Sequence, residues 1–296
     1  MMWFKEADME KTHTVYSKKT KAMRGLLFLL LLVVSFITLY PVIYIVLGSF
    51  KANNELLLGG TSILPKTFIF DNYKQAWEKA NFAVYTVNSL IISLGVMILT
   101  ILTTTMAGYV FARKKFKGKE FLYSIFVAFM FVNVGSVSLR PLFELAVKVK
   151  MNTSLLSIIL ISTGMGQATY IFLVRGFMNT ISRELDEAAK LDGCTFFQIY
   201  YKIILPLLKP VIATIGLLSF RTGWNEYIMP LVFTMSNDRL RPLTVGVVML
   251  KNSGDGTAAW NLMFAGSTIS IIPIIVIYMC TSRYFMSGLT AGAVKG

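Results

Sequence analysis

Hydrogen-bonding and ionisable side chains gather at two places in a chain that is otherwise mostly apolar. At the first place, Arg221, Trp224, Asn225 and Glu226 fall within six residues of a long apolar stretch. Arg221 and Asn225 are four residues apart, so they would share one face of a helix. With Thr222 they could line a water-filled pathway, or Arg221 could pair with Glu226 or Asn225 and hold helices together. Both roles are polar contacts rather than bond-breaking chemistry.

The second place is a polar segment that precedes this stretch and is predicted to form two short helices around a turn. Ser182 is a suitable N-cap, and the acids that follow it suit the positive end of a helix dipole. Gly193 stands where a helix end favours a residue free to adopt positive φ. Thr195 and Gln198 have the spacing of a capping box, and Pro206 closes the second helix. The first helix has a narrow apolar face of mostly small residues, suited to close docking: Leu185, Ala188, Ala189 and Leu191.

Catalytic and metal-binding patterns are missing from the sequence. Its single histidine, His13, lies in a polar N-terminal tail, and Cys194 and Cys280 are not spaced as metal ligands. The sequence has no G-x-x-x-x-G-K-[ST] phosphate-binding loop and no H-E-x-x-H motif. We therefore expect no catalytic residue, no metal site and no cofactor bound by this chain, which argues against an enzyme.

The elements that position these polar groups are long apolar stretches. Hydrophobic residues make up 55% of the 296 residues and charged residues 15%, with a mean hydropathy of +0.64. This composition excludes a disordered chain, a secreted disulfide scaffold and an ordinary cytosolic enzyme. About 20 apolar residues cross a bilayer as a helix. We therefore predict an all-α integral membrane protein with six spans, at about 25–49, 88–112, 121–139, 155–177, 207–233 and 264–285.

Basic residues predict the orientation of these spans. Of the 29 Lys and Arg residues, 18 fall before the first span, in the second and fourth connections, or after the last span. Because basic loops are retained in the cytoplasm, both termini are predicted there, and the net charge of +14 needs no nucleic-acid partner. The chain is expected to comprise a cytoplasmic tail (1–24), a six-helix domain (25–286) with a cytoplasmic loop (180–206), and a second cytoplasmic tail (287–296).

The polar loop resembles the signature of bacterial ABC importer permeases. Glu187-Ala188-Ala189, Gly193 and Ile203-x-Leu205-Pro206 match the pattern EAA-x3-G-x9-I-x-LP at every defined position. Residues 224–231 resemble the WNEY-x-x-PL segment of the maltose or carbohydrate type, and residues 287–296 resemble that family's tail. The likeness covers about residues 25–296 and points to the six-helix subunit of the permease pair, the inner-membrane component of a binding-protein-dependent system.

This resemblance implies a type I importer fold with a cytoplasmic coupling helix, in a bacterial cell membrane. It also implies a second homologous permease subunit, two ATPase subunits that hold ATP and Mg, and an extracytoplasmic solute-binding protein. The expected function is import of a mono- or oligosaccharide by alternating access, with Trp224 available to stack on a sugar face. The residues that the resemblance assigns to ATPase coupling are Glu187, Ala188, Ala189, Leu191, Gly193, Ile203, Leu205 and Pro206.

Two departures from the family pattern leave the solute open. Arg221 stands where the family more often has a small or neutral polar residue, and a guanidinium suits a carboxylate or sulfate. Residues 135–143 contain less proline than the family usually has there, and Arg140 and Glu144 could face the outer mouth or pair with each other. The alternatives are an ABC permease for a solute such as a polyamine or phosphate ester, or an ion-coupled secondary transporter. A secondary transporter should show an acidic relay and internal repeats.

Overall fold

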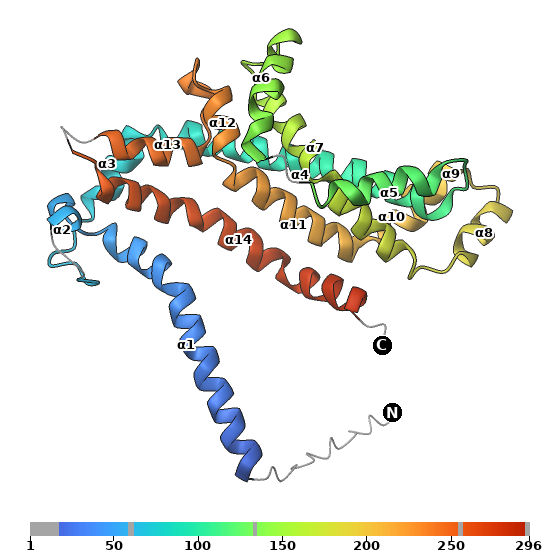
Figure 1. Ribbon diagram of the computed structural model, residues 1–296, viewed down its shortest axis with the longest axis horizontal. Helices are drawn as coiled ribbons and strands as arrows, with labels where there is room; N and C mark the ends of the chain where they lie inside the picture. Colours follow the sequence, from blue (N-terminus) through green and yellow to red (C-terminus); the bar gives the residue numbers. More distant parts are fainter. Residues whose placement is uncertain (1–17, 59–61, 133–134, 254–256, 294–296) are drawn as a thin grey trace, which may run out of the picture.

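The chain folds as a set of α-helices around a bundle of long apolar helices (Figure 1). The structure is a computed structural model that describes residues 18–58, 62–132, 135–253 and 257–293, and these residues contain no β-strand. Within them, four helical stretches are long and apolar enough to cross a membrane: Met23–Gly48, Phe82–Arg113, Leu155–Met178 and Trp260–Cys280. A bent pair, Phe196–Leu207 with Lys209–Asn225, makes a fifth if it counts as one span. The all-α membrane fold is therefore confirmed, whereas the count of six spans is not.

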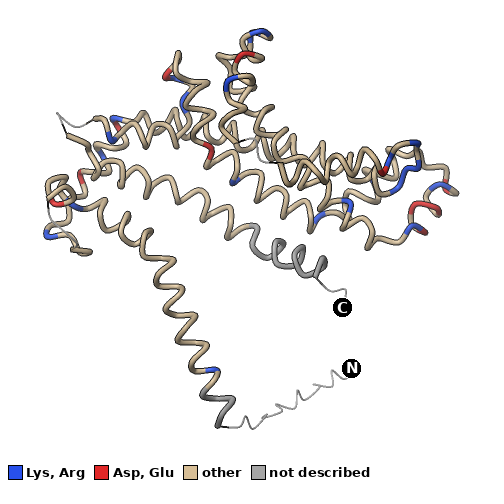
Figure 2. The backbone as a smooth tube through the Cα atoms, in the orientation of Figure 1, with Lys and Arg blue, Asp and Glu red and all other residues tan. Residues whose placement is uncertain are grey.

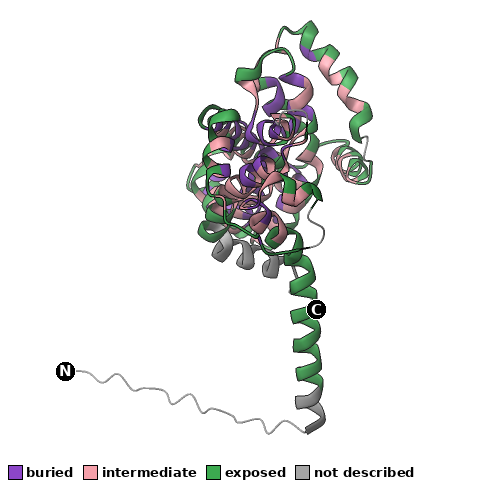
Figure 3. Ribbon diagram, turned by 90° about the vertical axis from the view of Figure 1, so that its left-hand side faces the viewer, coloured by how far each residue is buried: buried purple, intermediate pink, exposed green. Residues whose placement is uncertain are grey.

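The first helix, α1 (Lys18–Gly48), stands apart from the bundle (Figures 1 and 3). It begins at Lys18, ahead of the expected span, and the most apolar window of Met23–Gly48 is 0% buried within the chain. Only its last turns meet another helix, where the Tyr44 ring packs edge-on against Phe264 at a centroid distance of 5.9 Å. After the basic first turns, residues 25–48 of this helix carry no charge and are apolar on nearly every side, which suits an apolar surrounding over that stretch.

The bundle itself consists of α4 (Phe82–Arg113), α7 (Leu155–Met178), α11 (Lys209–Asn225) and α14 (Trp260–Ala293). Buried residues lie toward the centre of the molecule and exposed ones around it (Figure 3), and all four of these helices contribute to the buried core. Small residues allow the helices to approach closely, as is usual in membrane bundles. A Cβ atom added at Gly223 of α11 would lie 2.8 Å from the Cα of Ser93 in α4, and one at Gly108 would overlap Val174 of α7. These glycines set the spacing of the bundle.

The expected third span is interrupted. Helix α5 (Lys119–Phe129) has 11 residues and is followed by η1 (Gly135–Ser138) and α6 (Leu139–Lys148). The prediction of one helix over 121–139 is therefore wrong. Gly135 has a φ of +54°, which the interior of a continuous α-helix does not accommodate, and it is followed by serines and a valine rather than a continuous apolar stretch. In α6, Arg140 and Glu144 pair at 3.0 Å on an exposed face, which is one of the two predicted roles.

The expected fifth span also breaks, in two places. Helix α11 ends at Asn225, Glu226 adopts extended backbone angles, and a separate helix, α12 (Ile228–Phe233), follows. On the other side, α9 (Phe196–Ile199), the π-helical η2 (Tyr200–Ile204) and α10 (Leu205–Leu207) meet α11 at an angle of 79°. Pro206 and Pro210 stand in the first turns of α10 and α11, where the missing N–H is tolerated and a preceding helix is interrupted.

Short helices close the two ends of the bundle. At the end near α1 lie α2 (Asn53–Leu58), α3 (Asp71–Lys79), η3 (Asp238–Leu240), α13 (Leu243–Met249) and η4 (Leu250–Ser253). Asn72 ties α3 to the chain that follows α1 and to α14, because its side-chain amide donates to the carbonyls of Ser49 and Lys51 and accepts from Asn261. The opposite end carries α8 (Glu184–Leu191). Charged residues gather at the ends, and the helices between them carry few (Figure 2). This distribution is that of a chain crossing a bilayer.

Candidate functional site

The loop before α9 folds as the local sequence predicts. Helix α8 covers Glu184–Leu191, and Gly193 has a φ of +79° with open space around its Cα. Thr195 and Gln198 form both hydrogen bonds of a capping box, with N···O distances of 2.7 and 3.4 Å. Ser182 accepts a hydrogen bond from the Glu184 amide at 3.2 Å, although the N-cap position itself belongs to Arg183. The turn is therefore built by its own residues.

The apolar face predicted for α8 is divided between two sides of the helix. Ala189 is buried against the rest of the chain, whereas Ala188, Leu185 and Leu191 are exposed, with Leu191 90% exposed. Glu187 is also exposed, but it lies at the edge of the helix, beside the cavity described below. The outer side thus presents Ala188 and Leu191, with Glu187 at its edge, and the described part of the chain leaves these side chains uncovered.

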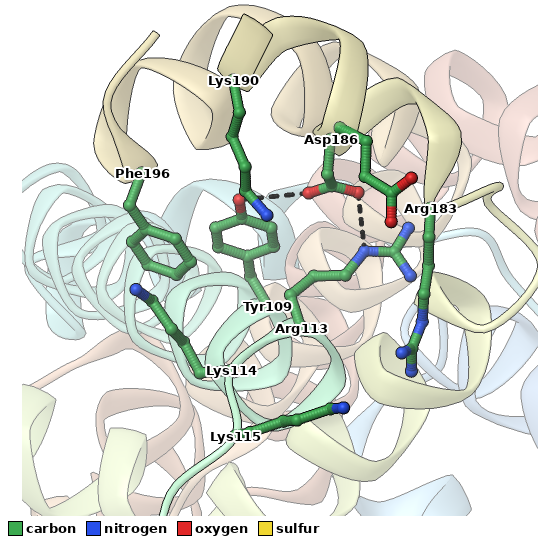
Figure 4. Close-up of a pocket in the computed structure, with 9 residues that line it drawn as sticks. Tyr109, Arg113, Lys114, Lys115, Arg183, Asp186, Lys190 and Phe196 are labelled. Atoms are coloured by element: carbon green, nitrogen blue, oxygen red, sulfur yellow. Dashed lines mark hydrogen bonds and ion pairs between the residues drawn. The ribbon is translucent and has the colours of Figure 1, made fainter. Parts of the chain in front are cut away.

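The inner side of α8 carries a buried acid. The Asp186 Oδ2 atom lies 2.8 Å from Arg113 Nε of α4, and both side chains are 7% exposed. The Tyr109 hydroxyl donates to Asp186 Oδ1 at 3.3 Å, and Arg113 Nη2 donates to the carbonyl of Ile181 at 2.8 Å. Figure 4 shows these side chains converging from α4 and α8. They line a cavity of about 310 Å³. Its lining residues are Tyr109, Arg113, Lys114, Lys115, Arg183, Asp186, Glu187, Lys190 and Phe196.

The second half of the signature packs against the bundle. Ile203 and Leu205 are half-buried beside a core cluster that includes Ile204, Val174 and Ile215. Pro206 is exposed at the start of α10. Ile203 and Leu205 therefore join the loop to α7 and α11 instead of forming a free surface.

The polar residues of α11 are not all on one side. Arg221 and Asn225 are exposed along with Thr222, as their predicted shared face requires. Trp224 is 2% exposed, stacks on Phe220 with ring centroids 5.8 Å apart, and donates through Nε1 to the Ser270 carbonyl. The prediction that Trp224 could stack on a solute is therefore wrong, because its ring faces the protein core.

Glu226 does not pair with Arg221. Its carboxylate accepts from the Met229 amide at 3.3 Å at the start of α12, and its carbonyl accepts from Thr244. No carboxylate of the described ranges forms an ion pair with Arg221. The predicted pairing of Arg221 with Glu226, which would have held helices together, is therefore absent from the described part of the chain.

Polar residues of two other helices lie beside this face, and sequence reasoning did not select them. Tyr170 of α7 lies beside Thr222 and Arg221. One turn earlier, Gln167 donates to the Thr103 hydroxyl of α4 at 2.9 Å. These residues extend the polar face of α11 across α7 to α4. Their only signal in the sequence was that polar residues occur within apolar stretches. The sequence did not show that the two helices carrying them are in contact.

The residues matched by a family model include both regions. Residues 101–290 match the model of the binding-protein-dependent transport system inner membrane component, and the chain belongs to this family. The match begins within α4 and covers α8, α11 and nearly all of α14.

Curated relatives match over nearly the whole chain. The arabinooligosaccharides transport system permease protein AraQ of Halalkalibacterium halodurans is 31% identical over 89% of this chain and 93% of its own length. The probable starch degradation products transport system permease protein AmyC of Thermoanaerobacterium thermosulfurigenes is 33% identical over 94% of this chain and 99% of its own length.

A solved structure shares the fold. A chain of a bacterial ABC transporter involved in the import of the acidic polysaccharide alginate superposes with a TM-score of 0.78 and 23% sequence identity. The superposition covers 91% of this chain and 99% of that chain. The arrangement of helices in Figure 1 is therefore the fold of that transporter chain.

Proposed function

We propose that this chain is the permease subunit of an ATP-driven, binding-protein-dependent importer of a sugar or oligosaccharide, working by alternating access. The observation that carries the proposal is α8, whose outer side exposes Ala188 and Leu191 while its inner side is fixed to α4 through Asp186. An exposed helix with apolar and acidic groups, attached firmly to membrane helices, is suited to receive force from another subunit. Family membership and relatives named for oligosaccharide transport support the solute class.

The proposed coupling surface is the outer side of α8 with the turn that follows it. Two ATPase subunits of the importer would hold ATP and Mg and contact Glu187, Ala188 and Leu191. Gly193 lets the chain turn back, and Ile203 and Leu205 carry the displacement into α7 and α11. The chain itself would have no catalytic role.

The proposed solute pathway is the polar face formed by Arg221, Thr222 and Asn225 with Gln167 and Thr103. A second, homologous permease subunit would complete it, and an extracytoplasmic solute-binding protein would deliver the sugar. The chain would lie in a bacterial cell membrane, with α8 and both termini on the cytoplasmic side. Arg221 adds a specific expectation, because an unpaired guanidinium can bind an acidic substituent such as a uronate or a sulfate through two hydrogen bonds.

Uptake and ATP hydrolysis by the assembled complex in proteoliposomes test this proposal. Gly193→Val forces a β-branched residue into positive φ, and Glu187→Lys reverses an exposed charge at the edge of α8. Both variants should assemble, hydrolyse ATP and lose most sugar uptake. Wild-type uptake should require ATP and should not respond to a proton or sodium gradient alone.

Gly118→Val is the matched control for the glycine variant. Gly118 also has positive φ, +80°, and open space around it, but it precedes α5 and lies outside the coupling surface. It should therefore suffer the same backbone strain and keep normal uptake per ATP hydrolysed. Normal uptake in both Gly193→Val and Glu187→Lys would contradict the coupling role of this loop.

A further inference from the structure

The charge of one acidic side chain of α8, Asp186, is balanced by a basic residue of α4, a helix far from α8 in the sequence. Asp186 meets Arg113 at the last turn of α4, with an Nε to Oδ2 distance of 2.8 Å and both side chains 7% exposed. Four further cations, Lys114, Lys115, Arg183 and Lys190, line the same cavity. Arg113 is the one that forms the ion pair, so the contact is specific to α4.

Arg113 makes a second contact besides its ion pair with Asp186. Its Nη2 atom donates to the Ile181 carbonyl at 2.8 Å, at the residue where the chain leaves α7 for α8. A guanidinium presents its donors in a fixed planar fork. One side chain of α4 therefore fixes both the approach to α8, through Ile181, and the inner side of α8, through Asp186; Figure 4 shows the contact with Asp186.

The same face of α4 reaches the second half of the loop. Thr105, Tyr109 and Arg113 recur every four residues, so they lie along one stripe of the helix. The Tyr109 hydroxyl donates to Asp186, and its ring stacks on Phe196 of α9 at a centroid distance of 4.6 Å. The Thr105 hydroxyl lies 2.8 Å from that of Tyr200 in η2. The stripe thus contacts α8, α9 and η2 in succession.

We propose that Tyr109, Arg113 and Asp186 form a latch that joins α8 to α4, so that a displacement of α8 is passed directly to α4. The inference rests on the proposed function, in which an ATPase subunit moves α8. Covalent continuity connects the loop only to α7 and α11. The latch adds α4, which packs against both of these helices. Removing one partner of a buried ion pair leaves an uncompensated charge, so the contact resists opening when α8 is displaced.

The test compares two single variants with their double variant in the assembled complex. Asp186→Asn keeps the size of its side chain, and Arg113→Gln keeps a polar but shorter one. Each leaves one unpaired charge, so each should lower the amount of assembled complex. The double variant removes both charges and should restore assembly. A latch predicts that the double variant still shows roughly tenfold less uptake per ATP hydrolysed. A purely structural ion pair predicts normal uptake per ATP, which would overturn the latch.

Arg113→Lys provides the deciding measurement if the double variant does not assemble. Lysine keeps the charge beside Asp186 but lacks the fork that also reaches the Ile181 carbonyl. We expect normal assembly with reduced uptake per ATP, and normal uptake per ATP would contradict the latch. Glu120→Gln is the control, because it removes an ion pair between α5 and Arg175 of α7 that does not touch α8. It should leave uptake per ATP unchanged.

The proposed function and the latch fail in different ways. If Glu187→Lys and Gly193→Val abolish uptake while the latch variants couple normally, the latch alone is wrong. If none of these variants alters uptake per ATP, the coupling role of the loop is wrong as well.

Discussion

The two polar regions of this molecule differ in how their charges are satisfied. Near α8, Asp186 is buried and held by Arg113 and Tyr109 of the same chain. On α11, Arg221 is exposed and forms no ion pair with any carboxylate of the described ranges. The first region is complete within one chain, as a mechanical connection must be. The second offers free donors, as a surface that meets a solute or another subunit must.

The largest difference between the regions should appear in stability. Asp186→Ala leaves Arg113 buried without its partner and should destabilise the fold by about 3–5 kcal/mol. Arg221→Gln breaks no ion pair within the chain and should change stability by no more than about 0.5 kcal/mol. Thermal unfolding of the purified complex in detergent measures both. Equal losses in the two variants would mean that Arg221 is also a structural residue.

A smaller effect should appear in the uptake of acidic and neutral oligosaccharides by an Arg221 variant. If Arg221 binds an acidic substituent, Arg221→Gln should reduce uptake of an acidic oligosaccharide by about tenfold to a hundredfold. This range corresponds to the loss of a charge-assisted hydrogen bond worth about 1.5–3 kcal/mol. Uptake of a neutral analogue of the same length should change little. Uptake assays with both sugars and the matching binding proteins decide this, and equal losses would assign Arg221 to contact with the second permease subunit.

The smallest effect should come from the hydroxyl of the latch. Tyr109→Phe removes the hydrogen bond to Asp186 but keeps the ring that stacks on Phe196. We expect a loss of about 0.5–1.5 kcal/mol in stability and a modest fall in uptake per ATP. Tyr109→Ala also removes the stacked ring and should cost distinctly more in the same unfolding experiment. A Phe variant as damaged as the Ala variant would place the importance of Tyr109 in its hydroxyl rather than its ring.

Local interactions were the part of this structure that sequence reasoning predicted well. The capping box of Thr195 and Gln198 and the positive φ of Gly193 depend on residues a few positions apart, so their chemistry is visible in the sequence. The continuous apolar stretches that became α1, α4, α7 and α14 were equally visible. The signature of the loop was sufficient to indicate the family.

Contacts between distant residues were not predictable in the same way. In the sequence, Asp186 resembles any acid in the first turn of a helix. Only the fold places Arg113 of α4 beside it, on the inner side of α8. Trp224 reads as a pathway residue because its neighbours are polar, yet α14 covers its ring and accepts its N–H. The interrupted helix after Phe129 was missed because hydropathy averages over a window and gives little weight to Gly135.

The isolation of α1 has a consequence for the order in which this protein is made. Because α1 is uncovered along most of its length, its stability in lipid does not depend on helices that the ribosome has yet to synthesise. It can therefore leave the translocon as a finished helix. Helices α4 and α7 differ from it, since 33% and 44% of the residues in their most apolar windows are buried, where the two helices pack against each other and against later segments. Among the described helices, α1 would thus insert independently, whereas α4 and α7 would become stable only as the bundle assembles.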